Sequence, residues 1–458
     1  MRTLVKNGHI ITAVDDYHAD IRIVDGVIAE IGRDLQDSNA EVIDAAGRLV
    51  FPGGVDPHTH LESFSGVTTT SDDFLTGSRA AAVGGTTTII DFAKQNKGET
   101  LHFAYEKWQD KARQRTCVDY GFHVIVVEMD EARLAEVPDL VASGVSSVKM
   151  YMAYRGRMMV DDGTLFRTML AFKASGGLVA LHAENGDVID VLVRQAVAAG
   201  QVSPKYHALT RPPILEAEAV HRAICIAEVA ESPVYFVHLS SRQALEELQR
   251  GRDRGLPVYA ETCPHYLILD DSRYDAPGFE GAKYVLTPPL RPVEHQEALW
   301  RGVRAGDIAV VSTDHCPYCF ADQKALGKDD FSKIPNGGPG IENRLALIYN
   351  AGVHGGRINT NQFVDLVATQ PAKIFGLFPR KGTLAIGSDG DLVIFDPQRD
   401  VTISASTHLM NIDYNMYEGM RLRGSVDEVL LRGKAIVRER KYVGQPGDGQ
   451  YLPRQRFR

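Results

Sequence analysis

From residue 49 onward, short apolar runs rich in β-branched residues alternate with segments of helical length. This alternation is typical of βα units, in which each parallel strand is followed by a helix that packs on the sheet. Eight such runs predict a (β/α)8 TIM barrel of the α/β class. They lie near residues 49–51, 86–90, 121–127, 147–152, 178–181, 234–237, 258–260 and 308–312.

The two ends of the chain have a different pattern, with short alternating strands separated by turn dipeptides such as Asn7-Gly8 and Asp25-Gly26. Neither end has enough strands to form a stable sheet alone, so we expect both to pack together as one small β-sandwich. The predicted composite domain comprises residues 1–50 and 378–458, and the barrel residues 51–377. The polar segment 444–458 is expected to form an arm over the surface or over a neighbouring subunit.

Composition argues against several classes of partner. The 458 residues carry a net charge of -9 and no basic block, so neither nucleic acid nor an anionic membrane surface is an expected partner. No apolar run approaches the roughly 20 residues that cross a bilayer, and the first residues alternate, unlike a signal peptide. The five cysteines are too few and too scattered for a disulfide framework. We therefore expect a cytoplasmic protein that acts on a small molecule.

Side chains that can bind metal follow several predicted strands at their C-terminal ends, where barrel enzymes have their active sites. A lone histidine is more often a buried imidazole with a hydrogen-bond partner than a ligand. Several of them at one end of the barrel favour a shared site, because imidazole and carboxylate groups suit borderline metals. The candidates are His58 and His60 after the first run, His182 after the fifth, His238 after the sixth and Asp314 after the eighth.

Lys149 lies inside the apolar fourth run. Burial of an ammonium costs several kcal/mol unless the charge is paired or removed. One interpretation is a buried salt bridge, for which the neighbouring sequence offers no acid. The other is a neutral amine that reacts with carbon dioxide to form a carbamate, whose two oxygens could bridge two cations.

The chain resembles the D-hydantoinase and dihydropyrimidinase family of the amidohydrolase superfamily along its whole length. One such motif would be weak, but eight in the same order are specific. They are FPGGVDPHTH at 51–60, GGTTT at 84–88, VKMYMAY at 148–154, HAEN at 182–185, VHLS at 237–240, TDHC at 313–316, PNG at 335–337 and KGT at 381–383.

The resemblance implies two divalent metal ions, usually zinc, and a water molecule that they activate. His58, His60 and Asp314 would hold the more buried ion, His182 and His238 the more exposed one, and a carboxylated Lys149 would bridge them. Asp314 would accept the proton of the attacking water and deliver it to the leaving nitrogen. Tyr154 would donate a hydrogen bond to the oxyanion.

The substrates implied are 5-substituted hydantoins or dihydropyrimidines, which would be opened to N-carbamoyl amino acids. Main-chain groups of Thr287 and Asn336 would hold the ring. Serine is common at the first of these positions in the family, so Thr287 is a mild departure. A homotetramer, or a homodimer, is also implied. The loop residues Leu61, Phe64, Met152 and Tyr154 favour an apolar or aromatic substituent on the ring.

Three families of relatives with other functions match the residues less well. Dihydroorotases commonly have arginine where this chain has Glu62, and an acid there would repel the substrate carboxylate. An allantoinase would prefer a more polar pocket. Non-catalytic scaffolds such as the collapsin response mediators typically lack part of the ligand set, whereas every ligand position here carries a competent residue.

Overall fold

Eight parallel strands form the centre of the fold, and each pairs with its neighbours in the sequence. The structure is a computed structural model and describes residues 1–457. The main chain of His60 donates to the carbonyl of His315 at 2.9 Å and nearly closes the cylinder between the last strand and the first. The predicted (β/α)8 barrel is confirmed. Its strands are β6 (Gly54–Thr59), β7 (Thr86–Lys94), β8 (Asp119–Ile125), β9 (Ser147–Tyr151), β10 (Leu178–His182), β11 (Val234–Phe236), β12 (Val258–Thr262) and β13 (Val310–Val311).

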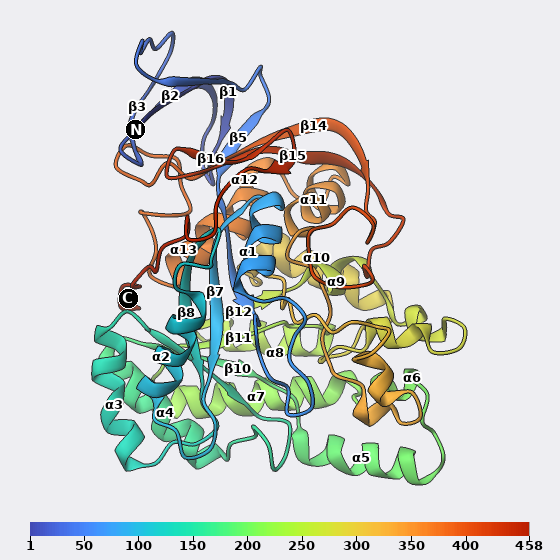
Figure 1. The fold of residues 1–458 in the computed structure, drawn as a ribbon. Coiled ribbons are helices and arrows are strands. Elements are labelled where there is room, and N and C mark those ends of the chain that lie inside the picture. Colours follow the sequence, from blue (N-terminus) through green and yellow to red (C-terminus); the bar gives the residue numbers. More distant parts are fainter. Residues whose placement is uncertain (458) are drawn as a thin grey trace.

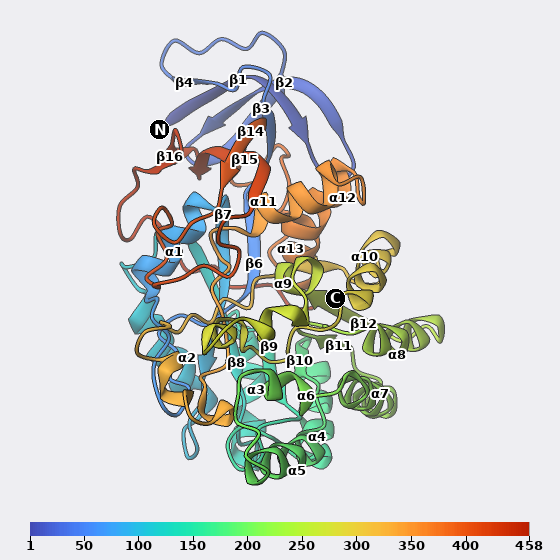
Figure 2. The same cartoon turned by 90° about the vertical axis from the view of Figure 1, so that its right-hand side faces the viewer.

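Helices surround the barrel strands (Figure 2). The first begins after Asp73, whose side chain forms a capping box with Thr76, and ends before Gly84. Among residues 1–457, no helix has the length and apolar character needed to cross a membrane. The helices are α1 (Phe74–Val83), α2 (Leu101–Ala112), α3 (Glu131–Ala142), α4 (Asp162–Ser175), α5 (Gly186–Ala198), α6 (Lys205–Leu209), α7 (Pro213–Ala230), α8 (Arg242–Asp253), α9 (Pro264–Ile268), α10 (Glu294–Ala305), α11 (Arg344–Ile348), α12 (Thr360–Val364) and α13 (Gln370–Ile374).

Both ends of the chain build a second, mostly antiparallel sheet at one end of the molecule (Figure 1). Its strands form one continuous hydrogen-bonded sheet, joined where β5 pairs with β14. Apolar residues of both ends, among them Ile23 and Ile394, pack in a core of its own. The strands are β1 (Arg2–Ile11), β2 (Asp16–Val24), β3 (Val27–Gly32), β4 (Glu41–Asp44), β5 (Leu49–Pro52), β14 (Leu392–Thr402), β15 (Arg421–Leu431), β16 (Lys434–Arg438) and β17 (Lys441–Tyr442).

The prediction that residues 49–51 form the first barrel strand was wrong. These residues belong to β5 of the terminal sheet, between β1 and β14. The chain then passes Gly53, where an added Cβ would lie only 2.1 Å from Oγ1 of Thr87. Glycine permits this close approach, and the first barrel strand follows as β6. Sequence alone could not separate two strands divided by one residue.

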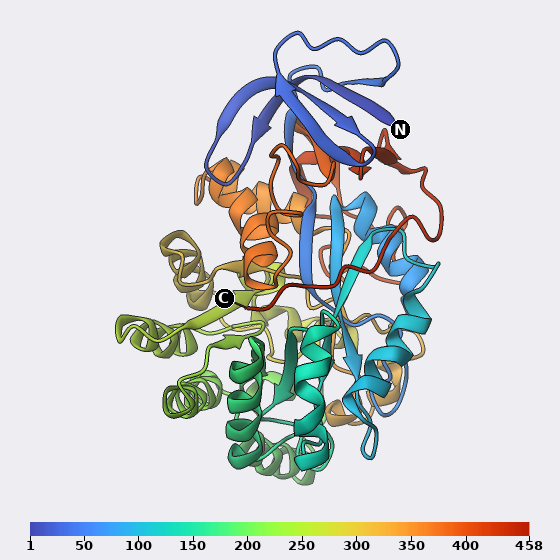
Figure 3. The same ribbon diagram turned by 90° about the vertical axis from the view of Figure 1, so that its left-hand side faces the viewer.

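The C-terminal arm packs on the barrel of its own chain (Figure 3). Main-chain hydrogen bonds join it to the N-terminal ends of three neighbouring strands. Gln450 bonds to the start of β8, Arg454 to Gly144 just before β9, and Phe457 to Gly176 just before β10. Leu452 of the arm is buried with Phe375 in a cluster that includes side chains of the barrel strands. The arm thus covers the N-terminal end of the barrel, opposite the ends that carry the candidate ligands.

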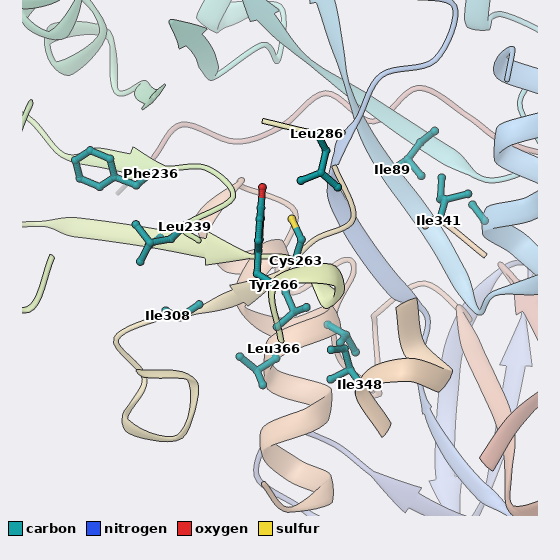
Figure 4. Packing of buried hydrophobic residues seen from close by; sticks show 14 of the residues in the cluster. Ile89, Phe236, Leu239, Cys263, Tyr266, Leu286, Ile308, Ile341, Ile348 and Leu366 are labelled. Carbon is teal, nitrogen blue, oxygen red and sulfur yellow. The ribbon is translucent and has the colours of Figure 1, made fainter. Parts of the chain in front are cut away.

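The largest core fills the space between the barrel strands and the surrounding helices. Figure 4 shows part of it, with Phe236, Leu239, Cys263 and Tyr266 among the labelled side chains. The hydroxyl of Tyr266 donates to the carbonyl of Pro288 at 2.5 Å, so this core also supports the loop that carries Thr287.

A buried ion cluster joins the terminal sheet to the barrel. Nζ of Lys381 lies 2.6 Å from Asp119 of β8, 2.9 Å from Asp389 and 2.7 Å from Asp391. Burial alone would lower the pKa of Lys381, but the three carboxylates outweigh it and raise that pKa. The three aspartates could otherwise group around a metal ion, but Lys381 occupies the space between them, and Arg432 and Arg380 pair with Asp119 and Asp389.

Lys381→Met should lower the free energy of unfolding by about 3–5 kcal/mol, because it removes the buried cation that Asp119, Asp389 and Asp391 share and leaves Asp391 without its ion pair. Urea unfolding followed by circular dichroism measures this change. The control is Lys434→Met, which removes a half-exposed partner of Asp448 and should cost less than about 1 kcal/mol. Equal losses of unfolding free energy in the two variants would contradict a stabilising role for the buried ion cluster.

Candidate active site

The six candidate ligands lie together at the C-terminal ends of the barrel strands. His58 belongs to β6 and His60 follows it, Lys149 belongs to β9, and His182 ends β10. His238 and Asp314 follow β11 and β13, and both have a positive φ, at 41° and 48°. Non-glycine residues in this conformation are strained, which is common where a side chain must be aimed at a functional site.

His58, His60 and Asp314 form the first group. Nε2 of His58 lies 3.0 Å from Oδ1 of Asp314, and Nε2 of His60 lies 3.4 Å from the same oxygen. The two imidazole nitrogens are 3.3 Å apart. Tetrahedral zinc with bonds of about 2.0–2.1 Å separates its ligand atoms by about 3.4 Å, so this group fits one ion.

His182 and His238 form the second group. Nδ1 of His182 lies 3.0 Å from Nε2 of His238, while the other nitrogen of His182 lies 2.8 Å from Glu184. The carboxylate of Glu184 therefore leaves Nδ1 free to face its neighbour. Burial, followed by the charge of His182, lowers the pKa of His238 well below its usual value. A neutral imidazole is the form that binds metal.

Lys149 lies beside the first group, with its Nζ 2.8 Å from Nε2 of His58. The side chain is buried, and its Nζ lies 4.5 Å from the centre of the Phe92 ring. Burial lowers the pKa of Lys149, although Asp314 and Glu261 oppose the effect. Within residues 1–457 no salt bridge includes this ammonium, so the salt-bridge interpretation has no partner to support it.

Asp314 is held as an anion by its neighbours. Burial would raise its pKa, but the neighbouring His58 and hydrogen bonds with His58 and His60 hold that pKa well below the usual range.

One cavity of about 430 Å³ joins the ligands to the predicted substrate contacts. Tyr154, Thr287 and Asn336 all line it, together with five of the six candidate ligands, His58 being buried behind them. Tyr154 has a φ of 68°. Burial raises its pKa, against hydrogen bonds with the Thr287 and Asn336 side chains, so its hydroxyl stays protonated and able to donate.

The apolar part of the cavity differs from the expectation. Phe64 and Tyr154 line it as predicted, but Leu61 and Met152 do not and are buried in the barrel core. An added Cβ at Gly77 would lie 2.4 Å from Leu61, which shows how closely that side chain packs on α1. Further apolar lining comes from Ile125 at the end of β8 and from residues that were not predicted to line the cavity, among them Val67, Met158 and Leu326.

Glu62 does not face the substrate cavity. Its carboxylate lies 2.6 Å from Nη1 of Arg115, and the cavity is lined instead by Lys94 and Arg157. Glu62 is therefore not placed to repel a substrate carboxylate, contrary to the prediction. The absence of arginine at this position still distinguishes the chain from the dihydroorotase pattern.

Glu261 is a site residue that sequence reasoning missed. It contacts Nδ1 of His58 through one carboxylate oxygen and accepts from the Tyr235 hydroxyl at 2.8 Å through the other. This contact turns Nε2 of His58 toward Asp314 and Lys149. The available signal was an acid within the apolar strand at 258–262.

A parallel barrel whose strand ends bring imidazoles, a carboxylate and a lysine around one cavity defines a class of metal-binding barrel hydrolases. The model of the amidohydrolase family matches residues 49–436. This chain belongs to the amidohydrolase family.

Comparison with individual proteins narrows the relationship. The chain is 53% identical to a D-hydantoinase of Geobacillus stearothermophilus, covering 100% of this chain and 97% of the relative. A crystal structure of a D-hydantoinase superposes with a TM-score of 0.99 at 52% identity over 100% of both chains. The structure of a dihydropyrimidinase from Brevibacillus agri NCHU1002 matches equally well, with a TM-score of 0.99 at 49% identity and complete coverage of both.

Proposed function

We propose that this protein opens the ring of 5-substituted hydantoins or dihydropyrimidines by hydrolysis and releases N-carbamoyl amino acids. The observation that carries the proposal is the gathering of six candidate ligands at the base of one cavity, in two groups with spacings of 2.8–3.4 Å between neighbours within each group. Full-length relatives named D-hydantoinase and dihydropyrimidinase support the substrate class and a preference for the D configuration.

The proposed centre holds two divalent ions, with zinc as the expected metal. His58, His60 and Asp314 would bind one ion, and His182 and His238 the other. Lys149 would join them as its N6-carboxylated form, because a carbamate replaces a buried ammonium that has no acid partner. When bound, ions of this kind polarise a carbonyl oxygen and lower the pKa of a water molecule.

The side chains of the protein move the proton and hold the substrate. Asp314 accepts a proton from the attacking water and returns it to the ring nitrogen as the amide bond breaks. Tyr154 donates a hydrogen bond to the oxygen that becomes negative during the attack. Main-chain groups of Thr287 and Asn336 hold the amide edge of the ring, and the apolar lining accommodates its substituent.

Tyr154→Phe should lower kcat by about 10²-fold, because it removes one donor to the developing oxyanion and little else. Steady-state assays of phenylhydantoin opening measure the effect. Tyr259→Phe, which alters a tyrosine that packs against Phe457 in the arm, is the control and should retain activity. An unchanged kcat in Tyr154→Phe would exclude the hydroxyl from the reaction.

A spectrophotometric screen tests the proposal as a whole. The purified protein is assayed with dihydrouracil, hydantoin, both enantiomers of phenylhydantoin, allantoin and dihydroorotate. We expect a clear rate with 5-substituted hydantoins, a preference for the D enantiomer, and dihydroorotate near background. Dihydroorotate or allantoin as the best substrate would overturn the substrate class while leaving the metal chemistry intact.

Metal analysis separates the enzyme from a non-catalytic scaffold. An enzyme of the proposed kind contains about two ions per chain and loses activity when a chelator removes them. A chain that binds no metal and opens none of these rings would be a scaffold.

We also infer a homotetramer, or a homodimer, in the cytoplasm. The family resemblance supports the assembly, and the sparse set of five cysteines, all free, supports a reducing compartment. Light scattering after size exclusion tests the assembly, and cell fractionation tests the location.

A further inference from the structure

Lys324 is a fully buried cation that the proposed reaction does not use. It lies in a short 3-10 helix, Lys324–Gly327, and has 0% exposure. No salt bridge within residues 1–457 includes it, and its hydrogen bonds go to main-chain carbonyls. Burial lowers the pKa of Lys324 to about 7, whereas hydrogen bonds from the ammonium to main-chain carbonyls favour its charged form.

Three carbonyl oxygens surround the ammonium. Nζ lies 2.8 Å from the oxygen of Val285, 2.7 Å from that of Pro335 and 2.7 Å from that of Gly337. An ammonium has three N–H donors and a neutral amine has two, so this arrangement uses the full capacity of the charged form. Each contact has the short length of a charge-assisted hydrogen bond.

The three carbonyls belong to two segments far apart in the sequence. Val285 lies two residues before Thr287, whereas Pro335 and Gly337 flank Asn336. The segments also touch directly, since the amide of Gly337 donates to the carbonyl of Val285 at 3.1 Å. Lys324 therefore ties together the two stretches of main chain that carry the proposed ring contacts.

These segments form part of the cavity wall, while Lys324 lies behind it. Thr287, Asn336 and Gly337 line the cavity. Gly337 has a φ of 145°, and an added Cβ would lie 2.3 Å from the carbonyl of Cys316, two residues after Asp314. The wall thus packs against the loop that carries the candidate base, and a shift of either segment would weaken its contacts to the ring.

We propose that Lys324 is a positioning residue for substrate binding, which holds the main chain of Thr287 and Asn336 at the spacing that fits the amide edge of the ring. This inference rests on the proposed function. Lys324 touches neither the cavity nor any candidate metal ligand, so its effect should be confined to ring binding.

The test compares Lys324→Met with the wild type and with Lys328→Met. Methionine keeps the length and apolar stem of lysine but cannot donate, while Lys328 is an exposed lysine four residues further along the same loop. We expect Lys324→Met to raise KM by about tenfold or more with kcat per metal-loaded site changed less than about threefold, the pattern of lost ground-state binding. Lys328→Met should match the wild type.

Two further measurements distinguish positioning from a purely structural role. Because the tied segments contact the ring rather than its substituent, KM should rise by a similar factor for hydantoin and for phenylhydantoin. Metal content should stay at the wild-type value. Lower thermal stability with an unchanged KM would overturn the inference and assign Lys324 to structure alone.

Failure of the proposed function and failure of the inference give different results. A wild-type protein that opens no ring refutes the proposed function, whereas an active wild type with an unaltered KM in Lys324→Met refutes only the inference. If Lys324→Met does not fold, Lys324→Gln replaces it, because glutamine keeps two donors and should give an intermediate KM.

Discussion

Lys149→Ala should reduce kcat by about 10³-fold or more, a loss of at least about 4 kcal/mol of transition-state stabilisation. Lys149 is the ligand proposed to join the two imidazole groups, and its Nζ lies 2.8 Å from Nε2 of His58. Alanine removes that bridge and leaves an apolar gap where the carbamate would be. We therefore expect the variant to lose metal as well as activity.

Three measurements check this prediction. Steady-state kinetics gives the loss of kcat, elemental analysis gives the metal content, and mass spectrometry of the native protein detects the carbon dioxide attached to wild-type Lys149. The control is Lys173→Ala, which alters an exposed lysine paired with Glu231. Full metal content and activity in Lys149→Ala would remove the bridging lysine from the proposed centre.

Asp314→Asn should lower kcat by about 10³–10⁴-fold, close to the upper range for the loss of one general acid and base. Asparagine has nearly the same shape as aspartate but cannot accept the proton that the reaction must move. His182 and His238 are untouched, so we expect at least part of the metal to remain. The expected result is therefore an inactive protein that still binds metal, unlike Lys149→Ala.

Substrate binding provides the check on Asp314. Phenylhydantoin should still bind to Asp314→Asn, as measured by calorimetry without turnover, because the proposed ring contacts are made by other segments. Asp329→Asn, at an exposed position in the loop after Lys324, is the control. Appreciable turnover by Asp314→Asn would show that another group carries the proton.

The position of the candidate ligands could be predicted because each follows a strand. Side chains at the C-terminal ends of parallel strands meet at one end of a barrel, so reading the strand ends was sufficient for His182, His238 and Asp314. The boundary of the first barrel strand could not be predicted in this way. Residues 49–51 and 54–59 are both extended and nearly contiguous, and only their pairing assigns them to different sheets.

The lining of the cavity was harder to predict than the ligands. Leu61 and Met152 are next to site residues in the sequence, but both turn into the barrel core. Glu62 turns to Arg115, more than fifty residues further along the chain. The direction of a loop side chain depends on which partner the folded chain brings near it, and no local pattern records that partner.

The sequence by itself determined the class of fold and the chemical types of the candidate ligands, because strand periodicity and residue identity are local properties. The tertiary structure decided which atoms of those residues face one another. Glu261 selects the nitrogen of His58 that points into the site, yet 203 positions separate them along the chain. Lys324 likewise joins segments that are neighbours only after folding. Such contacts depend on distances between strands and loops, which only the folded chain defines.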